Sequence, residues 1–204
     1  MRTLDPDKHA LQLEAILEAA KTCFARTGFH KTSTEAICSE AGVSSGKLFH
    51  YFPSKKAIIL AVVHEQTRQL GDYIGDLLQR EDLSTALLEC LDVILLLAGN
   101  TTERRLILEI AAEATRDGDV AALNTAGDRL LADGLTAILR GAAMRGQVSL
   151  IIPLEHAVRF LMIVIDGILY RASIDAGFDP AKERASLLTT IRSALGIVEG
   201  DPDA

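Results

Sequence analysis

Apolar side chains recur every three or four residues along most of this chain, which is the period of an α-helix that buries one face. Near the start of the sequence the repeat covers residues 10–26, with Ile16, Ala20 and Phe24 among its members. Gly28 follows, and glycine is the residue type that most often ends a helix. The pattern therefore predicts an amphipathic first helix that stops at about this glycine.

Two much shorter helices are expected next. Thr32 and Glu35 have the spacing of a capping box at the start of a helix, and Gly42 marks the end of that helix. Ser44 is placed to cap a third helix, which Pro53 interrupts. These signals predict helices of only two turns each, over residues 33–41 and 45–51.

The rest of the chain repeats the helical pattern six more times and lacks the alternation typical of strands. The helices predicted there cover residues 55–79, 85–98, 101–116, 119–145, 153–176 and 180–195. The sequence thus predicts an all-α protein. A three-helix domain of residues 1–54 is followed by a helical bundle of residues 55–204.

The charge of the chain is distributed unevenly, and the distribution is more informative than the net charge. The formal net charge is −7, which by itself disfavours a nucleic-acid partner. Residues 1–56 nevertheless hold eight Lys and Arg against six Asp and Glu, together with three histidines. Residues 57–204 hold thirteen Lys and Arg against twenty-two Asp and Glu. A mildly basic N-terminal part on an acidic remainder is compatible with a polyanionic partner for the N-terminal part.

Several classes of protein are disfavoured by what the sequence lacks. Its apolar runs are too short to span a bilayer, and residues 1–7 have no apolar run of a secretory signal. Three separated cysteines show no metal-binding spacing and are expected to be buried, reduced thiols: Cys23, Cys38 and Cys90. No P-loop, zinc-protease, serine-hydrolase or paired Glu-x-x-His pattern occurs. We therefore expect a cytoplasmic protein that is not an enzyme, has no metal or other cofactor and does not bind membranes.

The two short helices and the Ala41-Gly42-Val43 turn between them have the form of a helix-turn-helix. Gly42 supplies the left-handed backbone of the turn, while Ile37 and Val43 are expected to pack against the first helix. The second short helix then directs a small, polar, cationic and aromatic set outward, suited to a DNA major groove: Ser45, Gly46, Lys47, His50 and Tyr51.

With these residues in place, the stretch 16–63 resembles the N-terminal DNA-binding domain of the TetR family of bacterial regulators. The matching residues are Ile16 to Ala20, Phe24, Gly28, Thr32, Ser33, Ile37, Ala41 to Ser44, Gly46, Leu48, Phe49, Tyr51, Phe52, Ser54 and Lys55. No single residue decides the matter, but the ordered set is specific because every spacing matches at once. The resemblance implies a sequence-specific transcriptional regulator, expected to be a repressor that a small-molecule effector releases from its operator.

The resemblance assigns DNA contacts by position. Base edges and nearby phosphates are expected to face the start of the recognition helix, at Ser45, Gly46 and Lys47. The DNA backbone or the groove edge is expected at His50 and Tyr51, and phosphates at Thr32, Ser33, Ser44 and Lys55. Lys47 stands where small polar residues are common, and its added charge is suited to reading guanine.

The resemblance also implies a ligand cavity among the central helices and a homodimer formed through residues 153–176 and 180–195, which fits a near-palindromic operator. Candidate effector contacts are polar side chains within apolar helical runs: Arg105, Glu109, Glu113, Arg159, Asp166 and Tyr170. Pairing inside the fold is the simpler explanation of each buried charge. A shared cavity lined by the three carboxylates would favour a cation or a donor-rich molecule.

Two other classes of function stay open at this point. One is an enzyme built on a helical bundle, which the missing catalytic motifs disfavour. The other is a protein-binding adaptor that keeps the helix-turn-helix for packing alone, because each helix cap and each lysine also occurs in purely structural roles. Replacement of Lys47 and Tyr51 by alanine separates a regulator, which would lose DNA binding, from an adaptor, which would lose nothing.

Overall fold

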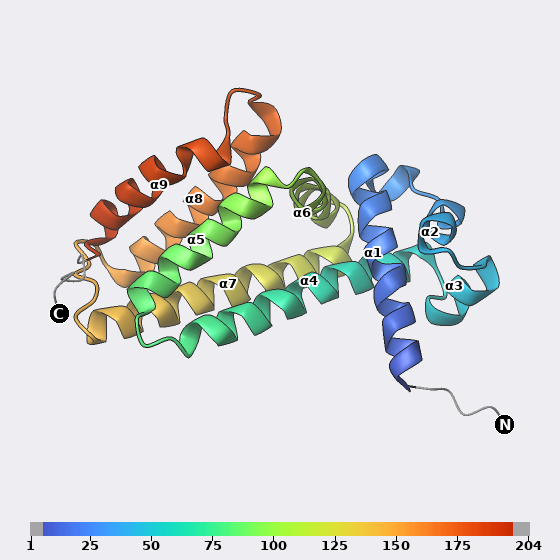
Figure 1. The fold of residues 1–204 in the computed structure, drawn as a ribbon, viewed down its shortest axis with the longest axis horizontal. Helices are drawn as coiled ribbons and strands as arrows, with labels where there is room; N and C mark the ends of the chain where they lie inside the picture. Colours follow the sequence, from blue (N-terminus) through green and yellow to red (C-terminus); the bar gives the residue numbers. More distant parts are fainter. Residues whose placement is uncertain (1–5, 198–204) are drawn as a thin grey trace. The chain divides into compact units, whose positions relative to one another are not determined.

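Helices account for most of residues 6–197, the part of the 204-residue chain that the computed structural model describes (Figure 1). In chain order they are α1 (Pro6–Lys31), α2 (Thr34–Ala41), α3 (Ser45–Tyr51), α4 (Lys55–Leu78), α5 (Leu83–Gly99), α6 (Thr101–Ala114), α7 (Gly118–Met144), α8 (Leu154–Ile174) and α9 (Pro180–Leu195). The described residues form one isolated β-bridge, between Val148 and Ile197. The predicted all-α class is confirmed for this range. Residues 1–5, which carry most of the expectation that no secretory signal is present, lie outside it.

The helix boundaries follow the sequence pattern closely in the second half of the chain and less closely in the first. Helix α9 has the predicted bounds, and α8 begins one residue after Pro153, which occupies its N-cap. Helix α1 starts four residues earlier than predicted and continues to Lys31 across a break at Gly28. Helix α2 is capped by Ser33, whose Oγ accepts a hydrogen bond from the Ala36 N–H at 3.1 Å. The predicted cap at Thr32 is therefore wrong by one residue.

The described chain divides into two compact units, each with its own set of contacts. The first, here called the head unit, comprises the described residues through Thr67 together with Arg105–Thr125. The second, the body unit, comprises Arg68–Arg104 and the described residues from Ala126 onward. The division falls inside α4 and not before it. The functional boundary between residues 54 and 55 stays a prediction.

The core of the head unit brings α1 to α4 together with the ends of α6 and α7. Phe24 and Phe29 lie at its centre, 0% and 1% exposed, with their rings edge to face at 4.8 Å. Helix α6 contributes Leu106 and Ile110, and α7 contributes Val120. Residues 105–125, which are separated in the sequence from the rest of the head unit by the 37 residues 68–104, thus contribute to the same core as the helix-turn-helix.

The body unit is a helical bundle in which α5 packs against both α8 and α9 (Figure 1). Arg184 of α9 donates two hydrogen bonds to the carboxylate of Asp92 on α5, which fixes the pairing of these helices. Helix α7 approaches its neighbours closely, since a Cβ on Gly134 would come within 2.7 Å of Ile74. Within the described residues no single helix is both long and apolar enough to cross a bilayer, although the bent pair α5–α6 passes that test when taken together.

Candidate nucleic-acid interface

The helix-turn-helix is built by local hydrogen bonds that its sequence specifies. Gly42 has φ 64° and ψ 34°, and its N–H together with that of Val43 returns to the last carbonyls of α2. Ser44 then caps α3, because its Oγ accepts the Lys47 N–H at 3.2 Å. Ile37 and Leu48, both 0% exposed, hold the two helices on the core. The predicted turn, cap and packing positions are confirmed.

Helix α3 directs most of its predicted reading set into solvent. Ser45, Gly46, Lys47 and His50 are exposed, and Tyr51 is half-buried. A Cβ on Gly46 would meet nothing within 4 Å, so nothing in the head unit requires a glycine here. Leu48 and Phe52 face the other way and are buried. One side of this short helix is therefore available to a large partner.

Two side chains of α1 reach the recognition helix. Gln12 Oε1 accepts a hydrogen bond from Lys47 Nζ at 2.6 Å. One turn earlier, the His9 ring lies 4.7 Å from the ring of Tyr51, centre to centre. Tyr51 also has the His50 ring at 5.6 Å, nearly perpendicular to it. The sequence patterns did not indicate these contacts, since the residues are distant in the chain.

The residues predicted to contact phosphates differ in their exposure and in their hydrogen bonds within the head unit. Ser33 is exposed, but Thr32 is 2% exposed and its hydroxyl bonds to the Gly28 carbonyl at 2.7 Å. Lys55 donates to the carbonyls of His30 and Thr32, both at 3.0 Å. Its ammonium therefore caps the C-terminal end of α1 and stays half-exposed. At this edge Ser33 and Lys55 are better placed than Thr32 to meet a phosphate.

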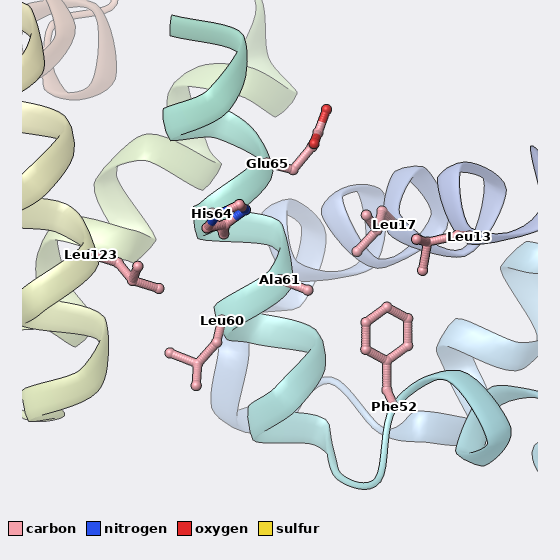
Figure 2. A pocket seen from close by; sticks show the side chains of 8 residues that line it. All are labelled: Leu13, Leu17, Phe52, Leu60, Ala61, His64, Glu65 and Leu123. Carbon is pink, nitrogen blue, oxygen red and sulfur yellow. The ribbon is translucent and has the colours of Figure 1, made fainter. Parts of the chain in front are cut away.

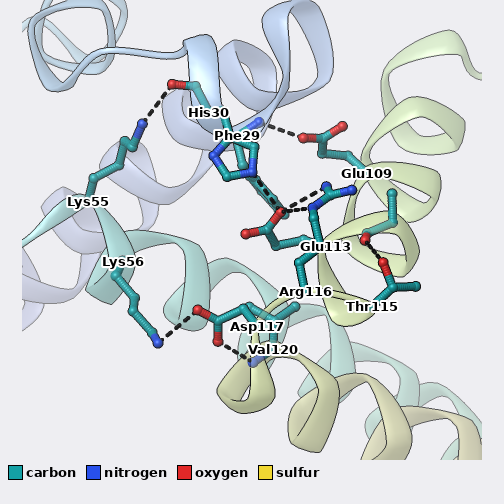
Figure 3. A network of polar contacts seen from close by, with 11 residues as sticks. Phe29, His30, Lys55, Lys56, Glu109, Glu113, Thr115, Arg116, Asp117 and Val120 are labelled. Atoms are coloured by element: carbon teal, nitrogen blue, oxygen red, sulfur yellow. Dashed lines mark hydrogen bonds and ion pairs between the residues drawn. The ribbon is translucent and has the colours of Figure 1, made fainter.

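A network of polar contacts joins α1 to α6 inside the head unit (Figure 3). Glu109 Oε1 accepts the Phe29 N–H at 2.7 Å. One turn further along α6, Glu113 Oε2 lies 3.0 Å from His30 Nε2 and accepts a hydrogen bond from Arg116 at 2.9 Å. The two carboxylates thus bind the backbone N–H of Phe29 and the side chain of His30, the two residues that follow the break at Gly28.

A second pair of carboxylates holds the start of α4, and Figure 3 shows one of them, Asp117, beside Lys56. Lys56 Nζ lies 2.8 Å from Asp117 and 2.7 Å from Asp119, both at the turn into α7. The hydrogen bond from Lys56 lowers the pKa of Asp117, and the two carboxylates raise the pKa of Lys56. The positive charge of Lys56 is therefore compensated inside the head unit.

A cavity of about 460 Å³ lies elsewhere in the head unit, between α1, α4 and α7 (Figure 2). Its lining is mostly apolar, with Leu17 and Phe52 on one side and Leu60 and Leu123 on another. His64 and Glu65 add the polar part of its wall. It is open to solvent and stands apart from the reading side chains of α3.

Comparison with known proteins agrees with this geometry. The model of the family described as "Bacterial regulatory proteins, tetR family" matches residues 16–62. The HTH-type transcriptional regulator UidR of Escherichia coli strain K12 is 31% identical over 182 residues, which cover 89% of each chain. This chain belongs to the TetR family. The HTH-type transcriptional repressor AcnR of Corynebacterium efficiens is 24% identical over 90% of this chain and 94% of its own. The structure of Salmonella enterica GusR has a TM-score of 0.70 at 29% identity, covering 90% of this chain and 95% of that one.

A member of the TetR family is a helix-turn-helix transcription regulator, and the relatives carry that description. The family assignment made from residues 16–63 is confirmed, and the relatives' descriptions support the expectation that this TetR-family protein is not an enzyme. The three cysteines are buried thiols, as expected, and burial raises the pKa of Cys90 to about 11.

The effector contacts predicted for this TetR-family chain lie in both units. Glu109 and Glu113 already have partners within the head unit, so an effector there would have to replace Phe29 or His30. In the body unit α8 carries Arg159, Asp166 and Tyr170. Burial, and next the charge of Asp128, raises the pKa of Asp166. The role of these residues in effector binding stays a prediction.

Proposed function

We propose that this TetR-family protein is a homodimeric repressor that binds a near-palindromic operator and leaves it when a small molecule binds. The observation that carries the proposal is the outward face of α3. Small residues, a lysine and a histidine stand exposed there on a helix whose opposite side is locked into the core. Small residues at the start of a recognition helix let its backbone approach base edges closely.

The homodimer is supported by an unusual face of α8. Ile163, Tyr170 and Ile174 are 64%, 56% and 57% exposed, and their spacing places them on one side of the helix. Contiguous exposed apolar side chains on a folded helix are typical of an interface. A two-fold pair of subunits built on α8 and α9 would supply two recognition helices for two half-sites.

Release by a small molecule is proposed from the family relationship and from the polar residues of the helical body. Asp166 has a raised pKa within the apolar stretch of α8 between Phe160 and Tyr170, and a perturbed pKa is a common property of ligand sites. Binding of an effector and of DNA would be coupled, so each would weaken the other by the same factor.

The test is a mobility shift with full-length protein and the DNA upstream of its own gene. We expect binding that weakens steeply with salt, because lysines displace counterions from phosphates. The variant Lys47→Ala/Tyr51→Ala should lose this binding while keeping its helical circular dichroism and its sedimentation behaviour. Binding by the variant equal to that of wild type would favour the adaptor alternative and overturn the proposal.

A further inference from the structure

We propose that Gln12 is a positioning residue for DNA recognition: it holds the Lys47 ammonium in one place, so that α3 reads a particular base pair. The inference rests on the proposed function, and it concerns a residue of α1 outside the helix-turn-helix. Gln12 and Lys47 are 35 residues apart in the sequence, yet their side chains are joined at 2.6 Å.

The positions of the two residues suit a contact in which Gln12 holds the side chain of Lys47 in place. Gln12 is half-buried on α1, while Lys47 is exposed in the first turn of α3. His9, one turn before Gln12, lies with its ring tilted against that of Tyr51 at the other end of α3. The same face of α1 therefore contacts the recognition helix near both of its ends, and at Lys47 it holds a side chain that the core of the head unit does not reach.

The chemistry of the acceptor matters as much as its position. A lysine has four flexible side-chain bonds and, left alone, meets any nearby phosphate. The Gln12 carbonyl takes one of the three ammonium donors and leaves two for acceptors on a guanine edge. Because an amide is neutral, the full positive charge of Lys47 remains available to DNA.

The neighbouring lysines show the contrast. Lys56 is held by two carboxylates, which compensate its charge. Lys55 is held by two backbone carbonyls at the end of α1. Lys47 is held by a single neutral side-chain oxygen at the exposed face. Lys47 and Lys55 both keep their charge and are both held in one direction, but of these three lysines Lys47 is the one on the exposed face of α3, where base edges are expected.

The experiment uses the full-length protein and a library of random-sequence duplexes, so that no operator has to be known. Bound duplexes are selected and sequenced for wild type, Gln12→Ala, Gln12→Glu and Lys47→Ala. Affinities for the most enriched duplex and for a scrambled one are then measured at several salt concentrations. Leu11→Ala is the matched control, since Leu11 is the adjacent α1 residue, is 66% exposed and carries no charge.

For Gln12→Ala we expect sequence preference to fall at one symmetric pair of positions. Affinity for the enriched duplex should drop about two- to tenfold, the cost of ordering one free lysine side chain on binding. Affinity for the scrambled duplex and the salt dependence should not change. Lys47→Ala should lose preference at the same positions, and adding Gln12→Ala to it should have no further effect.

The variant Gln12→Glu separates position from charge. A carboxylate would hold Lys47 in place and compensate its charge. Affinity should then fall for both duplexes, and the salt slope should decrease by about one per subunit. Circular dichroism and thermal unfolding of each variant should match wild type, because the hydrogen bond between Gln12 and Lys47 is exposed and contributes little to the core.

Several outcomes would overturn the inference. Unchanged base preference in Gln12→Ala would show that Lys47 is not positioned by it. An equal loss for both duplexes, with an unchanged salt slope, would make Gln12 itself a neutral phosphate contact. A similar loss in Leu11→Ala would make the effect general to α1. If wild type enriches no sequence and binds no duplex in a salt-sensitive way, the proposed function fails, and the inference fails with it.

Discussion

Gly28 has a backbone conformation that other residues rarely adopt. Its φ of 79° and ψ of 165° lie in a region populated almost only by glycine. The break it makes in α1 turns the Phe29 N–H toward Glu109, which accepts it at 2.7 Å. A Cβ at this position would also meet Glu109 Oε1 at 3.0 Å. One residue thus couples the end of α1 to α6 within the head unit.

We therefore expect Gly28→Ala to lower the free energy of unfolding by about 1–3 kcal/mol, from backbone strain and displacement of the Glu109 carboxylate. Urea denaturation followed by circular dichroism measures it. Gly75→Ala is the control, because Gly75 lies in α4 with nothing within 4 Å of a Cβ, and alanine there should stabilise by about 0.5–1 kcal/mol. Equal effects of the two substitutions would contradict the strain argument.

At the scale of a helix, α5 depends on its first cap. Asp82 accepts the N–H groups of Ser84 and Thr85 and both of their hydroxyls. The hydrogen bonds from Thr85, and then those from Ser84, lower the pKa of Asp82 from 3.8 to about 2. The stabilisation is present above the ordinary carboxyl pKa and is lost as the pH falls toward 2, because the protonated form is a poorer acceptor.

We expect Asp82→Ala to cost about 0.5–2 kcal/mol in the free energy of unfolding at neutral pH. Asp82→Asn keeps an acceptor oxygen without a titrating proton, so its difference from wild type should shrink as the pH falls from about 4 to about 2. Denaturation at a series of pH values measures both. A wild-type advantage over Asp82→Asn that persists at the lowest pH would show that charge plays no part in this cap.

Features that depend on neighbours in the chain could be read from the sequence, and features that depend on distant segments could not. The cap at Ser44, the turn at Gly42 and the bounds of α9 follow from local rules and are confirmed. Even so, Ser33 and not Thr32 caps α2, because the side chain of Thr32 is buried in the core and that of Ser33 is free to bond the start of the helix. Periodicity gave no sign of the Phe29–Glu109 contact, which spans 80 residues.

The sequence predicted which side chains of α3 face DNA, but it did not predict the contacts that hold these side chains in place. Their exposure follows from the helical period, since Leu48 and Phe52 fix which side is buried. The supports from Gln12 and His9 required knowledge of how α1 crosses α3. Likewise, the compensation of Lys56 by Asp117 and Asp119 depends on where α7 begins relative to α4, and no sequence spacing encodes that.

At the scale of the whole molecule, the proposed dimer can be tested by one charged substitution on α8. We expect Ile163→Arg to give a monomer by sedimentation velocity, because it puts a long charged side chain on the face of α8 that carries the exposed apolar parts of Tyr170 and Ile174. The monomer should keep its helical circular dichroism. It should lose about a hundredfold or more in operator affinity, since its two heads no longer bind together.

Met144→Arg is the matched control for this prediction. Met144 is 83% exposed at the end of α7, outside the helices proposed for the dimer. It should sediment like wild type. A monomer from both substitutions, or a dimer from both, would argue against an interface centred on α8.

The head unit is built from two separate segments of the sequence, which limits how its DNA-binding domain can be recombined with other proteins. Leu106, Ile110 and Val120 complete a core otherwise made by residues up to Val63. A recombination event with one crossover after α4 would join these three side chains to a core they did not evolve with. Exchanging the whole head unit while keeping the body unit therefore requires three crossovers, after residues 67, 104 and 125, whereas replacement of α3 alone leaves the shared core intact.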